Sequence, residues 1–207
     1  MIKKTSIILS LVCSVFLISC ASSKKSAVST SRPAGLRPVY VTNTKKINLL
    51  PPEKSFGVFD GIQVLNGNFG DTSFSLLSYT QIDATGISLS LMNDFGTDMG
   101  NLFYDGQQVI FDSAYFPKAL PGEYIICDIQ NAYYDEAALR ENYELADLIF
   151  EVWPAAVDVK KGGSDVQEIR RITDGKKLIE EITILENTIT IKNYLRGYEY
   201  NLMKVEE

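Results

Sequence analysis

The sequence lacks histidine: none occurs among its 207 residues. Without histidine, neither a Ser-His-Asp triad nor a Cys-His pair can form, and the commonest zinc ligand is missing. The remaining hydrolytic route is a pair of carboxylates of the glycosidase kind. No spacing of Asp and Glu residues in the sequence singles out such a pair. We therefore expect a protein that is not an enzyme.

Cysteine is also scarce. Cys13 lies in an N-terminal apolar run and Cys20 at its end, which leaves Cys127 as the lone thiol of the remaining chain. A lone thiol forms neither an intramolecular disulfide nor a thiolate metal site, and no phosphate loop, dinucleotide fingerprint or calcium loop is present. We expect no cofactor and no metal. We interpret Cys127 as a small core residue, because free cysteine is usually buried.

Basic residues are outnumbered by acidic ones. The sequence has 20 Lys and Arg against 26 Asp and Glu, for a formal net charge of -6. An acidic surface argues against nucleic acid as a partner. It argues equally against adhesion to anionic lipid head groups by charge, so that a link to a membrane should come from acyl chains.

Residues 1–19 have the pattern of a secretory signal peptide. Lys3 and Lys4 precede an apolar run that is too short for a comfortable membrane span, which needs about 20 residues. The run ends in Leu-Ile-Ser-Cys at positions 17–20, which resembles the lipobox of bacterial lipoproteins. We expect cleavage before Cys20 and lipid attachment to its sulfur. The alternative is an ordinary signal peptide followed by a cysteine of no special role.

The residue after this cysteine is Ala21. In the sorting pattern of bacterial lipoproteins, Asp at this position retains the protein in the inner membrane, so its absence implies export to the outer membrane. We expect a lipid anchor on the periplasmic face of the outer membrane. Residues 20–46 then form the lipidated cysteine and a flexible tether, since the first half of this segment is small and polar without apolar periodicity. Residues 47–207 suit a single β domain.

Residues 58–112 predict an antiparallel meander. Apolar stretches alternate with turns that contain Gly, Asp or both, residues that tolerate positive φ. Ile87, Leu89 and Leu91 alternate with serines, a strict period of two that indicates one apolar face and one wetter face. The pattern returns to strands over 147–204, and we expect both strand sets to form one continuous sheet.

Between these strand sets the period changes. The spacing of Ile125, Ile129 and Tyr133 predicts a helix over 121–133, with a proline at its start. A strand over 124–129 is the alternative, because Tyr-Ile-Ile-Cys is locally prone to β structure. Asp135 suits the N-cap of a second short helix. We expect the helical segment to pack on the apolar face of the sheet.

Several segments together resemble one known family. They are the lipobox, the Leu-Leu-Pro-Pro sequence at 49–52, and the segments 93–106, 116–133 and 193–202. They are similar to a family of bacterial outer-membrane lipoproteins with a domain of unknown function, DUF3261, which is grouped with the LolA/LolB-type lipoprotein carriers. The resemblance implies a mainly β (α+β) fold: a strongly curved antiparallel sheet forming an incomplete barrel, with short helices on its concave face.

The leading functional hypothesis is a non-enzymatic carrier or receptor that holds acyl chains or a lipidated partner in a hydrophobic cavity. The candidate lining residues are Leu89, Leu91, Ile125, Ile129 and Tyr133, although such residues are more often plain core. We also expect the interior to be incompletely filled, because two short helices offer little cover for so many strands. The alternative hypothesis is a structural or assembly lipoprotein that binds a protein partner of an envelope or lipid-synthesis system.

The lipobox yields a direct prediction. Changing Cys20 to alanine should abolish incorporation of labelled palmitate and leave an uncleaved or soluble product, because the acyl chains have no other sulfur to occupy at the cleavage site. Metabolic labelling followed by membrane fractionation measures both effects. Normal acylation of the Cys20→Ala chain would contradict the assignment.

Overall fold

A computed structural model describes residues 36–113, 120–154, 160–161 and 164–205. The predicted signal peptide, Cys20 and Ala21 lie outside the described residues. The segment 33–207 forms one compact unit. It contains every strand of the described sheet and the described buried core, which are the elements of an independently folding domain.

The fold is mainly β, and the strands come in two sets. The first comprises β3 (Phe59–Phe69), β4 (Thr72–Asp83), β5 (Gly86–Met92), β6 (Asp98–Tyr104) and β7 (Val109–Ser113). The second comprises β8 (Ile149–Pro154), β9 (Lys160–Lys161), β10 (Ser164–Asp174), β11 (Lys177–Leu185), β12 (Thr188–Asn193) and β13 (Tyr198–Lys204). All pairings are antiparallel, in the order β7-β6-β5-β4-β3-β13-β12-β11-β10-β8, with β9 paired to β10.

The pairing of β3 with β13 joins the two sets into one sheet. Its register runs from Phe69 opposite Tyr198 to Gln63 opposite Lys204. The prediction that both strand sets form one continuous antiparallel sheet is therefore confirmed. Two-residue hairpin turns connect β3 to β4 and β10 to β11, and their first residues, Gly70 and Gly175, have φ values of 57° and 60°. Such turns need a left-handed residue, which explains both glycines.

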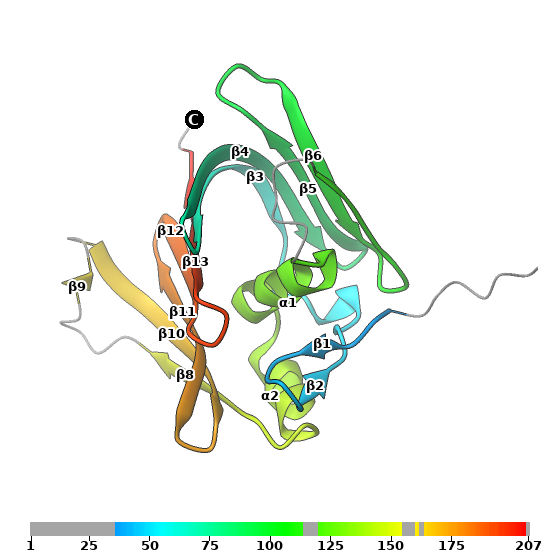
Figure 1. The fold of residues 1–207 in the computed structure, drawn as a ribbon, viewed down its shortest axis with the longest axis vertical. Coiled ribbons are helices and arrows are strands. Elements are labelled where there is room, and N and C mark those ends of the chain that lie inside the picture. The colour runs from blue at the N-terminus through cyan, green and yellow to red at the C-terminus, as the bar shows by residue number, and fades with distance from the viewer. Residues whose placement is uncertain (1–35, 114–119, 155–159, 162–163, 206–207) are drawn as a thin grey trace, which may run out of the picture. The chain divides into compact units, whose positions relative to one another are not determined.

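The sheet is strongly curved and arches over the helix α1 (Figure 1). Among the described strands, β7 and β8 stand at the two ends of the strand order and each pairs with one neighbour. The sheet therefore remains open, and the predicted incomplete barrel is confirmed. Arg140 donates to the carbonyl oxygen of Phe150 in β8 at 3.0 Å, so a side chain occupies part of this free edge.

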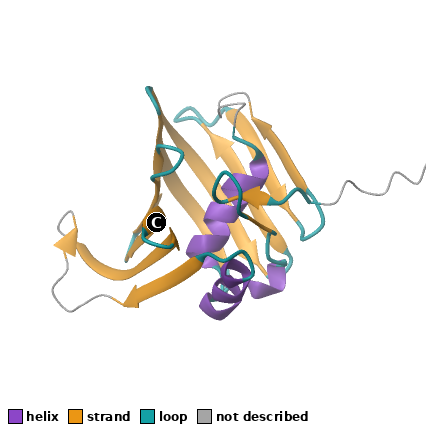
Figure 2. Ribbon diagram, turned by 60° about the horizontal axis from the view of Figure 1, so that its bottom comes forward, coloured by secondary structure: helices purple, strands orange, loops and turns teal. Residues whose placement is uncertain are grey.

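The helix α1 (Gly122–Tyr133) lies across the concave face, with α2 (Glu136–Glu144) beside its end (Figure 2). The helix predicted over 121–133 is confirmed, and the strand alternative is wrong. Pro121 precedes α1, and the Asp135 carboxylate accepts from the amide of Ala138 at the start of α2. Ten of the twelve residues of α1 are buried. Its position between the sheet and the N-terminal segment overrides the local β preference of Tyr-Ile-Ile-Cys.

The N-terminal segment covers the other side of α1. It contains β1 (Val39–Tyr40) paired with β2 (Lys46–Ile47), followed by the 3-10 helix η1 (Pro52–Lys54). The side chain of Gln130 in α1 accepts from the Leu50 amide at 3.0 Å and donates to the Leu50 carbonyl at 2.7 Å. The last part of the predicted tether contains β1 and the start of β2, and Val39 and Val41 are buried in the core.

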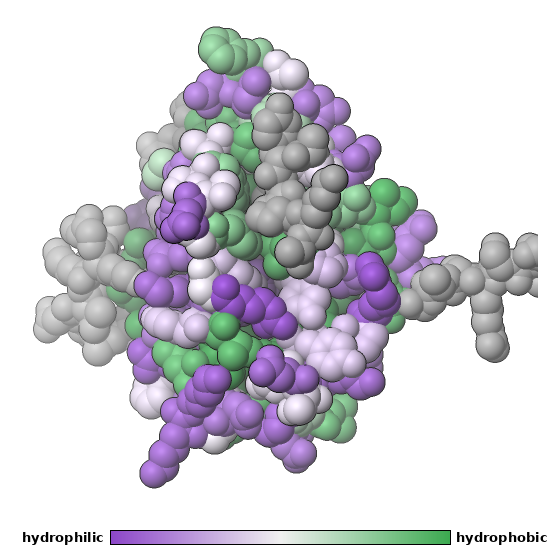
Figure 3. All heavy atoms as spheres, in the orientation of Figure 1, coloured by the Kyte–Doolittle hydropathy of each residue, from purple (hydrophilic) through white to green (hydrophobic). Residues whose placement is uncertain are grey.

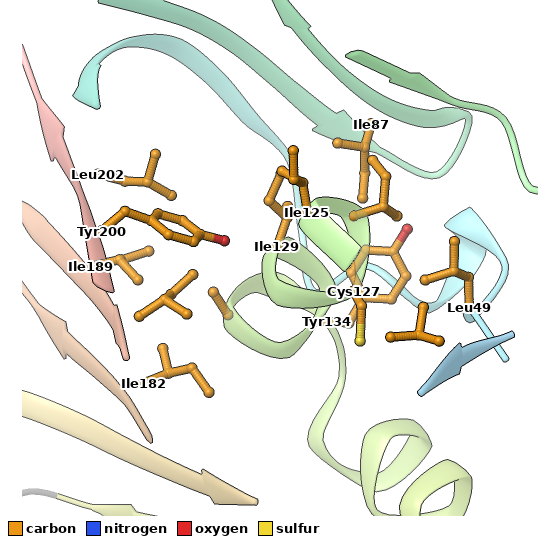
Figure 4. Close-up of a cluster of buried hydrophobic side chains, with 14 of the residues drawn as sticks. Leu49, Ile87, Ile125, Cys127, Ile129, Tyr134, Ile182, Ile189, Tyr200 and Leu202 are labelled. Atoms are coloured by element: carbon orange, nitrogen blue, oxygen red, sulfur yellow. The ribbon is translucent and has the colours of Figure 1, made fainter. Parts of the chain in front are cut away.

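A single apolar core fills the space between the sheet, α1 and the N-terminal segment (Figure 4). Ile87, Leu89 and Leu91 are buried as their alternation predicts, and Ile125 and Ile129 meet them from α1. Large aromatic side chains that the sequence patterns did not assign to the core occupy much of the remaining space. They are Tyr104, Tyr134, Tyr143 and Phe150.

The close packing of Gly122, at the start of α1, against β6 and β7 generates a prediction. A Cβ atom added at Gly122 would lie 2.8 Å from Phe111, 2.9 Å from Val109 and 3.2 Å from Leu102. Gly122→Ala should therefore lower the free energy of unfolding by about 1–3 kcal/mol, as overpacking does, measured by urea denaturation. The control is Gly61→Ala, where the nearest atom would be 3.7 Å away. Equal effects of both changes would contradict the close packing of α1.

Candidate functional site

Two hollows lie along the inner side of β3, β13 and α1. The larger one, at the C-terminal end of α1, has a volume of about 270 Å³. The smaller one lies beneath the helix and has a volume of about 20 Å³. Leu202 of β13 lines both. We call the larger hollow the vestibule and the smaller one the chamber.

The chamber is wholly apolar. Its lining residues are Leu65, Phe69, Leu89, Leu91, Leu102, Phe111, Leu120, Ile125, Ile129, Tyr200 and Leu202. A space of this size holds about one water molecule, and a water needs polar partners. Since every lining residue other than Tyr200 is a hydrocarbon side chain, the chamber favours apolar contents.

The vestibule is mixed in character. Apolar walls come from Phe59, Tyr133, Ile184, Ile189 and Leu202, and charged groups at its margin include Glu168, Arg170, Glu186 and Lys204. Lys204 lies over the ring of Phe59, with 5.9 Å between the ammonium nitrogen and the ring centroid. The vestibule can therefore contact both halves of an amphiphile, and the chamber only the apolar half.

The alternation of β3 explains why the two hollows differ. Side chains two residues apart point to the same face of a strand. Gln63 lines the vestibule and Leu65 lines the chamber, so one step along the inner face changes the lining from polar to apolar. On β13, Lys204 lines the vestibule and Tyr200 lines the chamber, and Leu202 between them lines both.

The structure distributes the predicted lining residues between these hollows. Leu89, Leu91, Ile125 and Ile129 line the chamber, whereas Tyr133 lines the vestibule. We expected an incompletely filled interior, and the space that remains beneath α1 has a volume of about 20 Å³. The cover estimated from helix length alone omitted the buried tyrosines and the N-terminal segment.

A polar network attaches α1 to the second strand set. The Asp128 carboxyl group accepts from the hydroxyls of Tyr198 at 2.7 Å and Tyr200 at 3.0 Å. Figure 4 shows the Tyr200 hydroxyl directed toward α1. The Glu180 carboxylate of β11 accepts from the amides of Asn131 and Asn193, each at 2.9 Å. These bonds give the buried carboxyl groups of Asp128 and Glu180 polar partners.

A side-chain hydrogen bond links the carboxyl groups of Asp128 and Glu180, which requires one of them to carry a proton. Asp128 and Glu180 are only 3% and 4% exposed. Burial raises the pKa of Asp128 well above its usual range, and the neighbouring charge of Glu180 raises it further. Burial also raises the pKa of Glu180, while hydrogen bonds from Asn131 and Asn193 oppose this. Because two buried like charges repel, Asp128 holds the proton and donates it to Glu180.

This carboxyl pair does not form a catalytic cleft. Among the described residues that line the vestibule or the chamber, neither Asp128 nor Glu180 is present. A substrate in either hollow would meet no carboxyl from the pair. The described residues also contain no group of three or more acidic or Cys side chains suited to a metal ion.

Arg170 of β10 closes the C-terminal end of α1. Its Nη1 donates to the carbonyl oxygens of Asn131 and Tyr134, each at 3.0 Å, and its Nε donates to Glu168. A cation at this end of a helix stabilises the exposed carbonyls. Because Arg170 also lines the vestibule, the same guanidinium contributes positive charge to that hollow.

Sequence patterns missed the buried polar residues that lie in and around the two hollows. Asp128 and Asn131 interrupt the apolar face of the predicted helix, which was a signal of buried polar partners. Gln63 likewise shares the inner face of β3 with Leu65. Their partners, Glu180 above all, come from distant strands, and only the sheet register brings them together.

Comparison with known proteins identifies the family. Residues 62–206 match the family described as "Protein of unknown function (DUF3261)". The chain belongs to the DUF3261 family. Both hollows of the DUF3261 domain are lined mainly by this matched region, and the resemblance inferred from the sequence segments is confirmed.

Two further comparisons concern individual proteins. No curated protein matches the chain. A crystal structure described as an outer membrane lipoprotein-sorting protein domain from Vibrio parahaemolyticus is similar at a TM-score of 0.27 and 11% sequence identity. That alignment covers 74% of this chain and 86% of the other. The family assignment rests on the DUF3261 match.

The carboxyl pair of the DUF3261 domain predicts a pH dependence of stability. The folded state keeps the Asp128 proton, whereas the unfolded chain releases it above about pH 4. The free energy of unfolding therefore falls as the pH rises from about 4 toward the raised pKa of Asp128, by up to about 1.4 kcal/mol per pH unit. Asp128→Asn preserves the bonds and removes the titration. Its stability relative to wild type should increase with pH.

Urea unfolding between pH 5 and 9 measures this difference. The control is Asp83→Asn at the turn between β4 and β5, where hydrogen bonds from Thr85 lower the pKa of the carboxyl group. Because this carboxyl is ionised in the folded and the unfolded state above pH 5, the control should show no comparable increase with pH. A stability difference between Asp128→Asn and wild type that is constant across the range would show that Asp128 is ionised in the folded protein.

Proposed function

We propose that this protein is a non-enzymatic lipoprotein, anchored through Cys20 to the periplasmic face of the outer membrane, whose DUF3261 domain binds an acyl chain. The chain would belong to a lipid or to a lipidated partner. One observation carries the proposal: along β3 and β13 the inner lining changes from the mixed vestibule to the wholly apolar chamber, with Leu202 shared by both.

This gradient matches an amphiphile. A polar head is compatible with the charged margin of the vestibule, and a hydrocarbon tail gains about 25 cal/mol for each Å² removed from water. At about 270 Å³, the vestibule is close to the roughly 300 Å³ at which ligand pockets begin. A tail that passes Leu202 would reach the chamber, where every neighbouring side chain offers apolar surface.

The attachment of α1 supports a way to enlarge the chamber. Hydrogen bonds that Asp128 accepts from β13 and that Asn131 donates to β11 hold the helix to these strands. Toward the first strand set, α1 presents Ile125 and Ile129 to an apolar surface. Apolar contacts are not directional, so a tail can separate α1 from β5 and β6 without breaking the polar network.

Membrane attachment in this proposal depends on the acyl chains at Cys20. In the portion of the chain that the structure describes, no helix is both long and apolar enough to cross a bilayer. In the orientation of Figure 3, the visible surface is largely hydrophilic with separate small hydrophobic areas. The leader at residues 1–19 and the lipobox at 17–20 support the same localisation.

A second candidate function is the binding of a protein partner as an assembly factor. A surface hollow of about 410 Å³ lies at the outer end of β3 and β13, and its lining includes Val58, Ile62 and Val205. Val58 is 79% exposed and the nearby Phe56 is 80% exposed. Exposed apolar side chains in one area favour interaction with another molecule.

An acyl-binding assay tests the leading proposal. The mature chain 20–207 with Cys20→Ala avoids lipid and detergent, and its fold is checked by circular dichroism. It should bind a fluorescent fatty acid at micromolar concentration. Ile184→Asp places a charge in the vestibule wall and should weaken binding about tenfold or more, because an acyl chain would desolvate the carboxylate.

The matched control is Ile110→Asp on the edge strand β7, where the side chain is 53% exposed and lines neither hollow. This variant should bind like the parent chain. If the folded parent binds no acyl probe at high micromolar concentration, or if both variants lose binding equally, the assembly function becomes the better explanation.

A further inference from the structure

Gln63 has an unusual position for an amide side chain. It lies on the inner face of β3 and is fully buried, with 0% of its surface exposed. Its Nε2 donates to the Tyr133 hydroxyl at 3.1 Å, whereas its Oε1 has no hydrogen-bond partner among the described residues. Leaving a buried acceptor unsatisfied costs about 1–3 kcal/mol, so we expect the unpaired Oε1 to have a function.

The location of Gln63 suggests that function. It lines the vestibule, and Leu65, the next residue on the same face, lines the chamber. An acyl chain that extends from one hollow to the other would place its junction with the head group beside this amide. The Tyr133 hydroxyl fixes the other end of the amide. Burial raises the pKa of that hydroxyl to about 12, so it remains protonated at physiological pH.

We propose that Gln63 is the polar anchor of the ligand site and that the ligand carries a hydrogen-bond donor at the start of its acyl chain. This inference rests on the proposed acyl-binding function and names the ligand class. An amide-linked acyl chain supplies an N–H at the required point, and a hydroxylated chain supplies an O–H. An ester-linked chain has only acceptors there, and these would face the lone pairs of Oε1.

The charged side chains around the vestibule are consistent with a ligand that carries an amide-linked acyl chain. Arg170 and Lys204 are donors without acceptor capacity and lie at the margin of the same hollow. The carbonyl of an N-acyl group is an acceptor that they can satisfy, while its N–H is left for Gln63. A site that offers both an acceptor and donors discriminates against an analogue that lacks the N–H, because Oε1 then stays unpaired.

Two nearly isosteric probes test the proposal: N-methyldodecanamide, which has the donor, and methyl dodecanoate, which lacks it. Each is titrated against the chain 20–207 with Cys20→Ala by displacement of the fluorescent fatty acid. The parent chain should bind the amide about five- to tenfold more tightly than the ester, because this factor corresponds to the free energy that one buried hydrogen bond usually contributes.

Gln63→Leu should abolish this preference by weakening binding of the amide, and the ester should bind at least as tightly as it does to the parent chain, because leucine removes the lone pairs that face its acceptors. Gln63→Met fills a similar volume with an unbranched side chain and replaces it if the leucine variant fails to fold. The control is Gln81→Leu on β4, an exposed amide that lines neither hollow. It should retain the preference of the parent chain.

The outcomes separate the two proposals. Equal preference for the amide in the parent and the Gln63 variants, or no preference in the parent, overturns the anchor role and leaves acyl binding intact. Binding of neither probe to the folded parent overturns both. Two further probes, N-dodecanoylethanolamine and an N-dodecanoyl tripeptide, distinguish the source: tighter binding of the peptide indicates a lipidated protein, and equal binding indicates a lipid.

Discussion

The hydrogen-bonded pair of Asp128 and Glu180 fixes α1 on the sheet, and much of the remaining structure depends on that position. Two tyrosine hydroxyls and two asparagine amides complete the pair. With α1 held in this register, Gln130 meets the Leu50 backbone and Tyr133 meets Gln63. A shift of α1 by one residue would separate all these partners together. Hydrogen bonds that are buried and directional therefore determine where the hollows lie.

The network is asymmetric, and this asymmetry places the apolar chamber. On the side of β10 to β13, α1 has specific polar partners, including the Arg170 guanidinium at its C-terminal end. On the side of β5 to β7, Ile125 and Ile129 face leucine and phenylalanine side chains. Apolar packing tolerates small displacements better than a hydrogen-bond network does. The vestibule opens where the carboxyl network ends, beside the last turn of α1.

The sequence predicted the parts of this fold that depend on local periodicity. The alternation at Ile87, Leu89 and Leu91 and the helical spacing of Ile125 and Ile129 correctly gave the strands, the helix and their buried faces. The sequence did not predict β1 and β2, which are two residues each, because a pattern that short carries no period. It also did not predict Glu180 as the partner of Asp128. That contact depends on the register of β11, which no local pattern encodes.

The carboxyl pair and Gln63 show two ways in which this protein places polar groups in its interior. The pair forms its hydrogen bonds within the network. Burying it costs stability, but it fixes α1 at one position on the sheet, whereas an apolar substitute would pack without fixing the register. Gln63 is satisfied on one side only, by Tyr133. A core selected for stability alone would carry leucine at this position, as it does two residues later at Leu65. The amide is retained next to the shared wall of both hollows, where an acceptor costs stability in the empty protein and can recover it when a ligand donates.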